Sequence, residues 1–328
     1  MARDRAHRPS RREFLRKAAC AGAGLLVLRG PLWGAEAADP LPTRVLGRTK
    51  AKVTILGLGT APIGEGPPTT DEAERIFGEA MDRGITYIDT ARSYGNAEAA
   101  LGRLVPQRRD QLFVVTKLWT DSAARAEKLL ATSLRTLKVD YLDLCHIHHV
   151  GGKDVDKVLA KDGILEFLRK QKEKGTIRFI GLSGHCRPPR FLRVLETGQI
   201  DVVMPVMNYA DRNTYNFEGT VLPECRKRGV GVVAMKVYAG IKGGFRNHRK
   251  AHVGCATRPE LLPEAMAYAL DLEGVAVANV GPYTLEQAVQ NVQFAHGYKP
   301  LTDEERAKLL AVGKAMAPKL GLRYGPRS

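Results

Sequence analysis

The chain has 328 residues, of which 44% are hydrophobic and 26% are charged. These values are ordinary for a globular protein, and the length suits one large α/β domain. The formal net charge is +16, but residues 1–37 alone contribute +5, from eight basic and three acidic side chains. The remaining basic residues are spread over predicted helices without a recognition motif, which argues against a nucleic-acid-binding protein.

The first forty residues have the pattern of an export signal. A basic segment at residues 10–17 precedes a short apolar stretch at residues 18–28, and Ala35-Glu36-Ala37 forms a small-x-small cleavage site. The apolar stretch is too short to span a bilayer. SRREFL at residues 10–15 resembles the twin-arginine consensus, which implies recognition by the twin-arginine export machinery.

We therefore expect residues 1–37 to be a twin-arginine signal peptide. The mature protein is expected to be periplasmic or otherwise exported, without a stable membrane span. It would be tethered to the membrane where the signal stays uncleaved. An ordinary basic amphipathic N-terminus is the alternative.

From residue 43 onward, short apolar runs alternate with amphipathic ones. The apolar runs lack a clean alternation of apolar and polar residues, as is typical of strands covered on both faces. Strands are predicted at residues 55–59, 87–89, 112–116, 141–146, 177–182, 202–206, 231–235 and 274–280. Helices are predicted at residues 70–83, 122–138, 156–174, 188–197, 222–228, 259–270 and 284–296.

Eight strands alternating with helices favour an α/β fold, the (β/α)8 TIM barrel. An open doubly wound sheet is the alternative. It is disfavoured because no G-x-G-x-x-G follows the first strand, and Gly57-x-Gly59 alone is weak. Residues 44–54 predict an N-terminal β-hairpin that closes the bottom of the barrel, and residues 302–316 predict an extra C-terminal helix. The barrel domain then covers residues 43–316 and leaves a C-terminal tail at 317–328.

The cysteines predict no metal site. Cys20 lies in the leader, and the others are widely separated at Cys145, Cys186, Cys225 and Cys255, without a C-x-x-C pair. An exported protein can form disulfides, but the sequence does not show which of these four cysteines would pair. Small buried thiols are the preferred interpretation.

Polar residues stand where consecutive predicted strands end. Asp89 ends the second strand, Lys117 follows the third and His148 follows the fourth, while Tyr94 lies in the loop after Asp89. Each residue alone is explained as well by a structural role, but strand ends meet at one mouth of a barrel, so the four should converge. An ammonium lowers the pKa of a nearby phenol, an aspartate can hold that ammonium, and a histidine can donate to a carbonyl oxygen. Together they suit proton transfer to a carbonyl as a nicotinamide delivers hydride.

Two segments resemble the aldo/keto reductase family. GITYIDTARSYG at residues 84–95 is similar to its G-x-x-x-x-D-T-A-x-x-Y-G signature, and YLDLCHIH at residues 141–148 is similar to Y-x-D-L-x-x-x-H. The resemblance covers residues 43–315 and implies reduction of an aldehyde or ketone, or the reverse reaction, with a nicotinamide cofactor. It implies that Tyr94 is the general acid, that Lys117 and Asp89 tune it, and that His148 orients the carbonyl. His149 stands where many members have an aromatic residue, so it is expected to line the substrate mouth.

The resemblance also implies a set of cofactor contacts: Gly59, Thr60, Ser183, Gly184, His185, Met204, Met235, Lys236 and Asn291. Three of these positions depart from the family pattern. Gly184 replaces an asparagine, with His185 as the expected substitute. Met204 falls near a usual glutamine, and Met235 near the aromatic residue that stacks on nicotinamide. The segment GLSGH at residues 181–185 resembles a branch of the family with G-x-[ST]-G-H.

The residues expected near the cofactor do not show whether it is NADP(H) or NAD(H). Residues 281–287 contain no Lys or Arg that would hold a 2′-phosphate, so the expectation of NADP(H) over NAD(H) rests on the habit of the family. The loop of residues 236–250 contains Lys242, Arg246, Arg249 and Lys250. It is either a cover for the pyrophosphate or a solvated basic loop.

Two other functions are compatible with these residues. One is a Schiff-base lyase with Lys117 as the nucleophile. The other is a nicotinamide-binding redox sensor with little turnover, which the departures at Gly184, Met204 and Met235 suggest. Because free NADPH is not expected outside the cytoplasm, an exported reductase is expected to retain its cofactor tightly.

Overall fold

The chain divides into residues 1–39 and a compact unit of residues 40–328. The structure, a computed structural model, describes residues 40–242, 247 and 254–328. The predicted signal peptide, with Cys20, therefore lies outside the described residues. So do Arg246, Arg249 and Lys250 of the basic loop.

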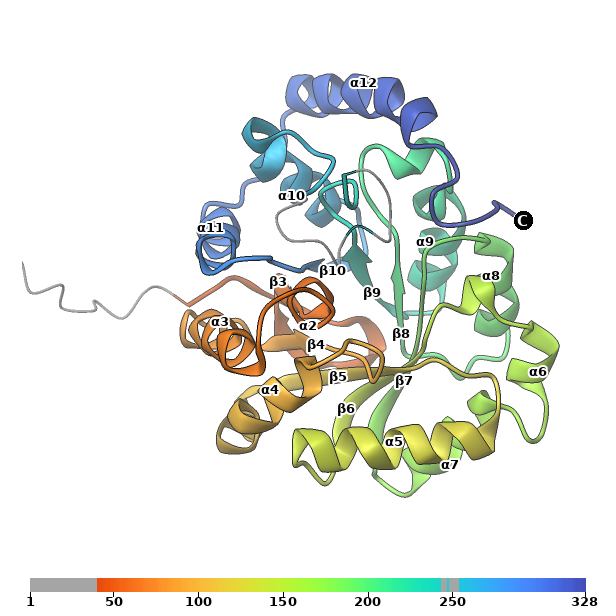
Figure 1. Cartoon of the computed structure of the whole chain (residues 1–328). Helices are drawn as coiled ribbons and strands as arrows, with labels where there is room; N and C mark the ends of the chain where they lie inside the picture. Colours follow the sequence, from red (N-terminus) through yellow and green to blue (C-terminus); the bar gives the residue numbers. More distant parts are fainter. Residues whose placement is uncertain (1–39, 243–246, 248–253) are drawn as a thin grey trace, which may run out of the picture. The chain divides into compact units, whose positions relative to one another are not determined.

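Eight parallel strands close into a barrel within the described part of the chain (Figure 1). Neighbours along the chain pair with each other, and the last strand pairs with the first, so no edge stays open. The strands are β3 (Leu56–Gly59), β4 (Tyr87–Asp89), β5 (Phe113–Leu118), β6 (Leu142–Ile147), β7 (Ile177–Gly184), β8 (Val202–Pro205), β9 (Gly231–Met235) and β10 (Val275–Val280). Apart from Arg178 and Phe179, every residue in them is buried, which explains the missing alternation. The predicted TIM barrel is confirmed and the open sheet is excluded.

Helices surround the barrel (Figure 1). They are α2 (Ala61–Gly64), α3 (Thr70–Asp82), α4 (Ala97–Leu104), α5 (Ala123–Leu137), α6 (Val155–Leu159), α7 (Ile164–Glu173), α8 (Pro188–Leu195), α9 (Phe217–Lys227), α10 (Leu262–Leu270), α11 (Leu285–His296) and α12 (Asp303–Leu320). Capping boxes begin α3 and α12, where Thr69 pairs with Glu72 and Thr302 with Glu305.

The helices differ from the sequence prediction in four respects. The helix expected at residues 156–174 is two helices, α6 and α7, because the backbone is extended at Ala160 and Gly163, with ψ of 159° and 165°. Helix α9 begins five residues earlier than expected, after Asn216 caps it. Helices α2 and α4 were not predicted. Helix α12 runs to Leu320, beyond the helix end expected at residue 316.

The predicted hairpin lies against the N-terminal ends of the strands. Strands β1 (Thr43–Val45) and β2 (Lys52–Thr54) pair antiparallel around a tight turn. The backbone N–H of Arg48 donates to the Gly229 carbonyl just before β9, and Arg44 Nη1 donates to the Val275 carbonyl at the start of β10, at 2.8 Å. Leu46 is fully buried between these contacts. The hairpin therefore closes the bottom of the barrel, as expected.

Cys145, Cys186 and Cys225 are buried and Cys255 is half-buried, all as free thiols, as preferred from the sequence. In the part of the chain that the structure describes, none of the helices is both long and apolar enough to cross a bilayer. Within the same residues, no group of three or more His, Cys, Asp or Glu side chains is arranged to hold a metal ion.

Candidate active site

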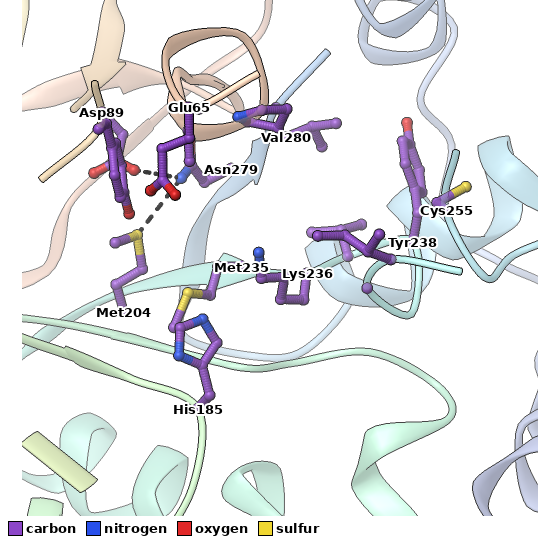
Figure 2. Close-up of a pocket in the computed structure, with 18 of the residues that line it drawn as sticks. Glu65, Asp89, His185, Met204, Met235, Lys236, Tyr238, Cys255, Asn279 and Val280 are labelled. Atoms are coloured by element: carbon purple, nitrogen blue, oxygen red, sulfur yellow. Dashed lines mark hydrogen bonds between the residues drawn. The ribbon is translucent and has the colours of Figure 1, made fainter. Parts of the chain in front are cut away.

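A cavity of about 660 Å³ lies at the C-terminal ends of the barrel strands (Figure 2). This volume is in the range of small-molecule sites. Strand ends and the loops after them form most of its wall, and residues of the C-terminal tail complete it. The sequence-predicted residues that line it are Gly59, Asp89, Tyr94, His148, His149, His185, Met204, Met235 and Lys236.

A buried ion pair lies beneath the cavity. Lys117 Nζ donates to Asp89 Oδ2 at 2.7 Å and to the Thr90 carbonyl oxygen at 2.9 Å. Lys117 was expected to follow its strand, but β5 continues to Leu118, so Lys117 lies within the strand and its side chain is only 1% exposed. Burial lowers the pKa of the Lys117 ammonium, and the adjacent Asp89 carboxylate opposes that shift. The two charges neutralise each other inside the barrel. Asp89 lines the cavity, whereas Lys117 does not.

The phenol of Tyr94 lies beside this ion pair. Lys117 Nζ is 4.6 Å from the centroid of the Tyr94 ring. Burial, together with the negative charges of Asp89 and Glu65, raises the pKa of Tyr94 well above its ordinary value. The expectation that the ammonium would lower this pKa is therefore wrong, because burial outweighs it. The phenol carries its proton at neutral pH, as a proton donor must.

His148 completes the group. It directly follows β6, and its backbone N–H donates to the Leu118 carbonyl at 3.1 Å. The rings of Tyr94 and His148 meet edge to face, with centroids 5.7 Å apart. Burial, and then the charge of Lys117, lowers the pKa of His148 well below its ordinary value, so the imidazole is neutral at pH 7. Asp89, Tyr94, Lys117 and His148 thus converge as the sequence predicted, and a neutral imidazole can donate one hydrogen bond into the cavity.

Two histidines and a tryptophan form part of the mouth. His149 adopts the left-handed region, with φ of 57°. Its ring stacks on Trp119 with centroids 5.3 Å apart, and its Nδ1 lies 3.4 Å from Nδ1 of His185. His149 lines the cavity, as expected. His146 instead faces the barrel core beside Gly181 and is fully buried.

Five of the predicted residues support the cavity from behind its wall: Thr60, Lys117, Ser183, Gly184 and Asn291. The Thr60 hydroxyl donates to the Asp89 carbonyl at 3.0 Å, and Ser183 Oγ accepts from the backbone N–H of His149 at 3.4 Å. Asn291 Oδ1 accepts from the hydroxyl of Tyr238, which does line the cavity.

The glycine at position 184 has a packing cause. A Cβ at Gly184 would lie 2.8 Å from Cζ of Phe191 on α8. The asparagine that the family pattern leads one to expect would not fit here while Phe191 holds its place, because real Cβ atoms do not approach so closely. The departure from the family pattern is thus coupled to the way in which α8 packs on β7.

Lys236 lies immediately after β9 and lines the cavity. Its backbone is left-handed, with φ of 58°, and its carbonyl accepts from Asn208 Nδ2 at 3.0 Å. Burial lowers the pKa of Lys236 to about 8, although Glu65 opposes the shift. A lysine that changes its charge near neutral pH therefore faces the same cavity as Tyr94.

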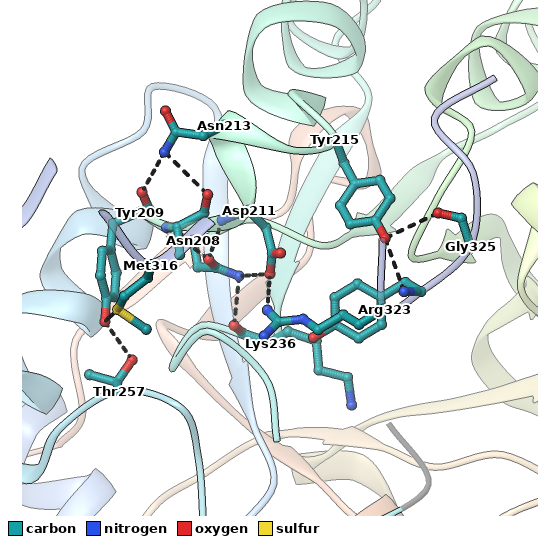
Figure 3. Close-up of polar contacts among 12 residues, drawn as sticks. Asn208, Tyr209, Asp211, Asn213, Tyr215, Lys236, Thr257, Met316, Arg323 and Gly325 are labelled. Carbon is teal, nitrogen blue, oxygen red and sulfur yellow. Dashed lines mark hydrogen bonds and ion pairs between the residues drawn. The ribbon is translucent and has the colours of Figure 1, made fainter. Parts of the chain in front are cut away.

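Sequence reasoning missed several residues of the wall, among them Glu65, Trp119, Tyr238, Asn279, Arg323 and Tyr324. Asn279 offered a signal, since it is the single polar residue in the apolar run of β10. Arg323 and Tyr324 offered none, because they reach the mouth only through the path of the tail after α12. Figure 3 shows how the tail is held there: Tyr215 accepts from the backbone N–H of Tyr324 at 2.9 Å and donates to the Gly325 carbonyl at 3.1 Å.

Comparison with known proteins decides the family. The model of the aldo/keto reductase family matches residues 55–264, which is more than half of the chain. The chain belongs to the aldo/keto reductase family. The resemblance of its two motifs and the convergence of the four polar residues agree with that membership.

Individual relatives share about a quarter to a third of their residues with this chain. L-galactose dehydrogenase from Arabidopsis thaliana is 31% identical over 58% of this chain, and the match spans 63% of that protein. The solved structure of aldo-keto reductase AKR11C1 from Bacillus halodurans, in its holo form, is 27% identical with a TM-score of 0.68, over 84% of this chain and 97% of that one. An aldo-keto reductase from Klebsiella pneumoniae, solved in complex with NADPH, is 23% identical with a TM-score of 0.66, over 84% and 95% of the two chains. The last likeness shows the fold alone.

Proposed function

We propose that the chain is an NAD(P)(H)-dependent oxidoreductase that reduces an aldehyde or ketone to an alcohol by hydride transfer, or catalyses the reverse reaction. One observation carries this proposal: in a chain of the aldo/keto reductase family, a protonated phenol at Tyr94 faces a cavity beside a neutral imidazole at His148. A proton donor and a hydrogen-bond donor at one point are what a carbonyl oxygen needs as negative charge develops on it.

The wall of the cavity fits a nicotinamide. Met204 and Met235 line the same cavity as Tyr94 and His148, and their thioether groups pack well on flat rings. A bound nicotinamide supplies or accepts the hydride. His148 orients the carbonyl oxygen, Tyr94 gives it the phenolic proton, and in the reverse direction the phenolate takes a proton from the alcohol. The Lys117 ammonium stabilises that phenolate, and Asp89 holds the ammonium in place.

For the cofactor we favour NADP(H). The habit of the family supports this, and the K. pneumoniae enzyme with the same fold is a complex with NADPH. Lys236 lines the cavity and is protonated below its pKa of about 8. Against NADP(H), residues 281–287 carry no basic side chain.

For location we favour twin-arginine export to the periplasm. The support is the SRREFL motif, the short apolar stretch and the cleavage pattern of residues 1–37. An exported reductase needs a retained cofactor or a partner that renews it, so we propose tight retention. Purification of the exported protein with nicotinamide still bound supports this; a cofactor lost on simple gel filtration argues against it.

The two other functions are not favoured. A Schiff-base lyase needs an accessible amine, but Lys117 is 1% exposed and its ammonium already binds Asp89 and Thr90. A sensor without turnover has no need of a proton donor beside a carbonyl-orienting imidazole.

The test is nicotinamide binding and turnover with the full chain. Fluorescence quenching by NADPH and NADH measures binding, and 4-nitrobenzaldehyde serves as the carbonyl probe. Tyr94→Phe is expected to bind within about threefold of wild type and to lose turnover by about 10²- to 10⁴-fold. Tyr141→Phe is the control, because its ring packs under Arg109 before β6, at the other end of the strand from the mouth. Saturable binding of neither nucleotide refutes the proposal.

A further inference from the structure

We infer that Asn279 is a positioning residue for this reaction, whose side-chain amide fixes the Asp89 carboxylate so that Lys117 stays beneath Tyr94. The inference rests on the proposed function. It adds a residue that lies outside both sequence motifs, on the last strand of the barrel.

The amide of Asn279 joins three strands across the barrel interior. From β10, Nδ2 donates to Asp89 Oδ2 on β4 at 2.9 Å, and it lies 3.6 Å from Met204 Sδ on β8 (Figure 2). The residue is 8% exposed and borders the cavity. A single amide thus contacts both the ion pair and a thioether of the cavity wall.

The orientation of this amide follows from chemistry. If the amide were flipped, its oxygen would face the carboxylate of Asp89, and two acceptors would repel each other. The nitrogen must therefore point toward Asp89. The cost appears on the other side, where Asn279 Oδ1 is buried and accepts no hydrogen bond from the described residues. Folded proteins rarely leave such an atom unpaired, so an amide kept at this cost indicates a role for its donor.

The neighbouring strand makes room for the amide. Gly57 pairs with Asn279 in the β3–β10 ladder. A Cβ on Gly57 would lie 3.0 Å from Asn279 Oδ1 and 2.8 Å from Cδ1 of Tyr87. A side chain at position 57 would therefore crowd Asn279. Because Gly57 has no side chain, the amide of Asn279 can occupy this space.

The consequence for the reaction passes through Asp89. A lysine side chain is a flexible stem with a point charge, so an ion pair alone leaves the carboxylate free to rotate with it. The short amide of Asn279 stands on a strand and gives the carboxylate a fixed direction. Lys117 then remains between Asp89 and the ring of Tyr94, 4.6 Å from the ring centroid. Without the amide, Asp89 and Lys117 can move together away from the phenol.

Steady-state kinetics of the full chain with NADPH and 4-nitrobenzaldehyde test the inference. Asn279→Leu removes the donor at nearly the same size. We expect kcat to fall by about 10- to 100-fold, since small displacements of catalytic groups cost that much, while KM and the Kd for NADPH stay within about threefold. Val277→Ala is the matched control: it loosens the same strand two residues earlier, in the buried core, and leaves Asp89 untouched.

A pH profile adds a readout that a structural role would not move. In Asn279→Asp a second carboxylate lies next to Asp89, and two such groups share one proton. While the two carboxylates share a proton, their net charge is −1, as it is for Asp89 beside Asn279 in wild type. As pH rises this proton is lost, so the activity of the variant should be greatest at acid pH and fall as pH rises. The exchange variant Asp89→Asn with Asn279→Asp restores the hydrogen bond but moves the carboxylate away from Lys117. We expect it to recover the melting temperature lost in Asn279→Asp at pH 8, but not kcat.

Two results would overturn the inference while wild type is active. One is an Asn279→Leu rate within threefold of Val277→Ala. The other is an exchange variant that recovers both stability and kcat, since the amide would then be merely structural. An inactive wild type with both nicotinamides refutes the proposed function itself, and is thereby distinguished from these two results.

Discussion

Arg323 and Asp211 form a buried ion pair although they lie 112 residues apart. Arg323 Nη2 is 2.6 Å from Asp211 Oδ2, and the two side chains are 7% and 1% exposed. Asn208 Nδ2 donates to the same carboxylate oxygen and also to the carbonyl of Lys236 (Figure 3). The ion pair therefore ties the C-terminal tail to the loop after β8 and to the strained backbone at Lys236.

The first prediction concerns the stability that this ion pair controls. Arg323→Leu leaves the Asp211 carboxylate buried without its cation, so the free energy of unfolding should fall by about 3–5 kcal/mol. Urea unfolding followed by circular dichroism measures this change. The double variant Arg323→Leu with Asp211→Leu removes both charges and should recover part of the loss. A single variant within 1 kcal/mol of wild type would show that the pair does not hold the tail.

The second prediction concerns the wall that the tail adds to the cavity. The ring of Tyr324 lies 5.2 Å from the ring of His185, and both line the cavity. Tyr324→Ala removes that part of the wall, and about 1.4 kcal/mol of lost contact corresponds to a tenfold fall in kcat/KM for an aromatic aldehyde. Tyr324→Phe keeps the ring and should lose less. Equal kinetics for Tyr324→Ala and wild type would remove the tail from the substrate site.

The third prediction concerns the pH dependence of stability. His146 is fully buried, and burial lowers its pKa well below the ordinary value. In the unfolded chain the imidazole takes up a proton below about pH 6.5, whereas in the folded chain it stays neutral. Its stabilising contribution is therefore complete above that pH and is lost as pH falls, by up to about 1.4 kcal/mol per pH unit.

The measurement is urea unfolding at several pH values between 7 and 5. His146→Gln should make the free energy of unfolding fall less steeply with decreasing pH, because one of the buried histidines that take up a proton on unfolding is gone. His296→Gln, at the exposed end of α11, is the control. If the two variants show the same slope as wild type, His146 already carries its proton in the folded chain.

The sequence predicted the barrel well, because a strand that is buried on both faces is a continuous apolar run and can be recognised without knowing which strands it pairs with. It also predicted that Asp89, Tyr94, Lys117 and His148 converge, since this follows from the fold alone, although Lys117 lies within β5 and not after it. Some helix boundaries were wrong. The break between α6 and α7 comes from extended backbone at Ala160 and Gly163, which the apolar periodicity of the two flanking segments does not show.

The residues that support the site were harder to predict, because their roles depend on contacts with other elements. Gly184 is explained by Phe191 on the following helix, and the role of Asn279 by the Asp89 carboxylate, which lies 190 residues away in the sequence. Arg323 reaches the cavity only because the tail returns to the barrel mouth after α12. Each of these contacts joins two segments of the chain, whereas periodicity and motif spacing describe one segment at a time.

The contact between Asp89 and Asn279 joins residues 190 positions apart, across the seam where β10 meets β3. Such long-range pairing forms slowly, because the chain must first close a large loop. The catalytic ion pair is thus fully oriented only after the ring of strands has shut. In refolding from urea, helical circular dichroism should return before enzyme activity does, and the delay between them would report the time that the last strand needs to dock.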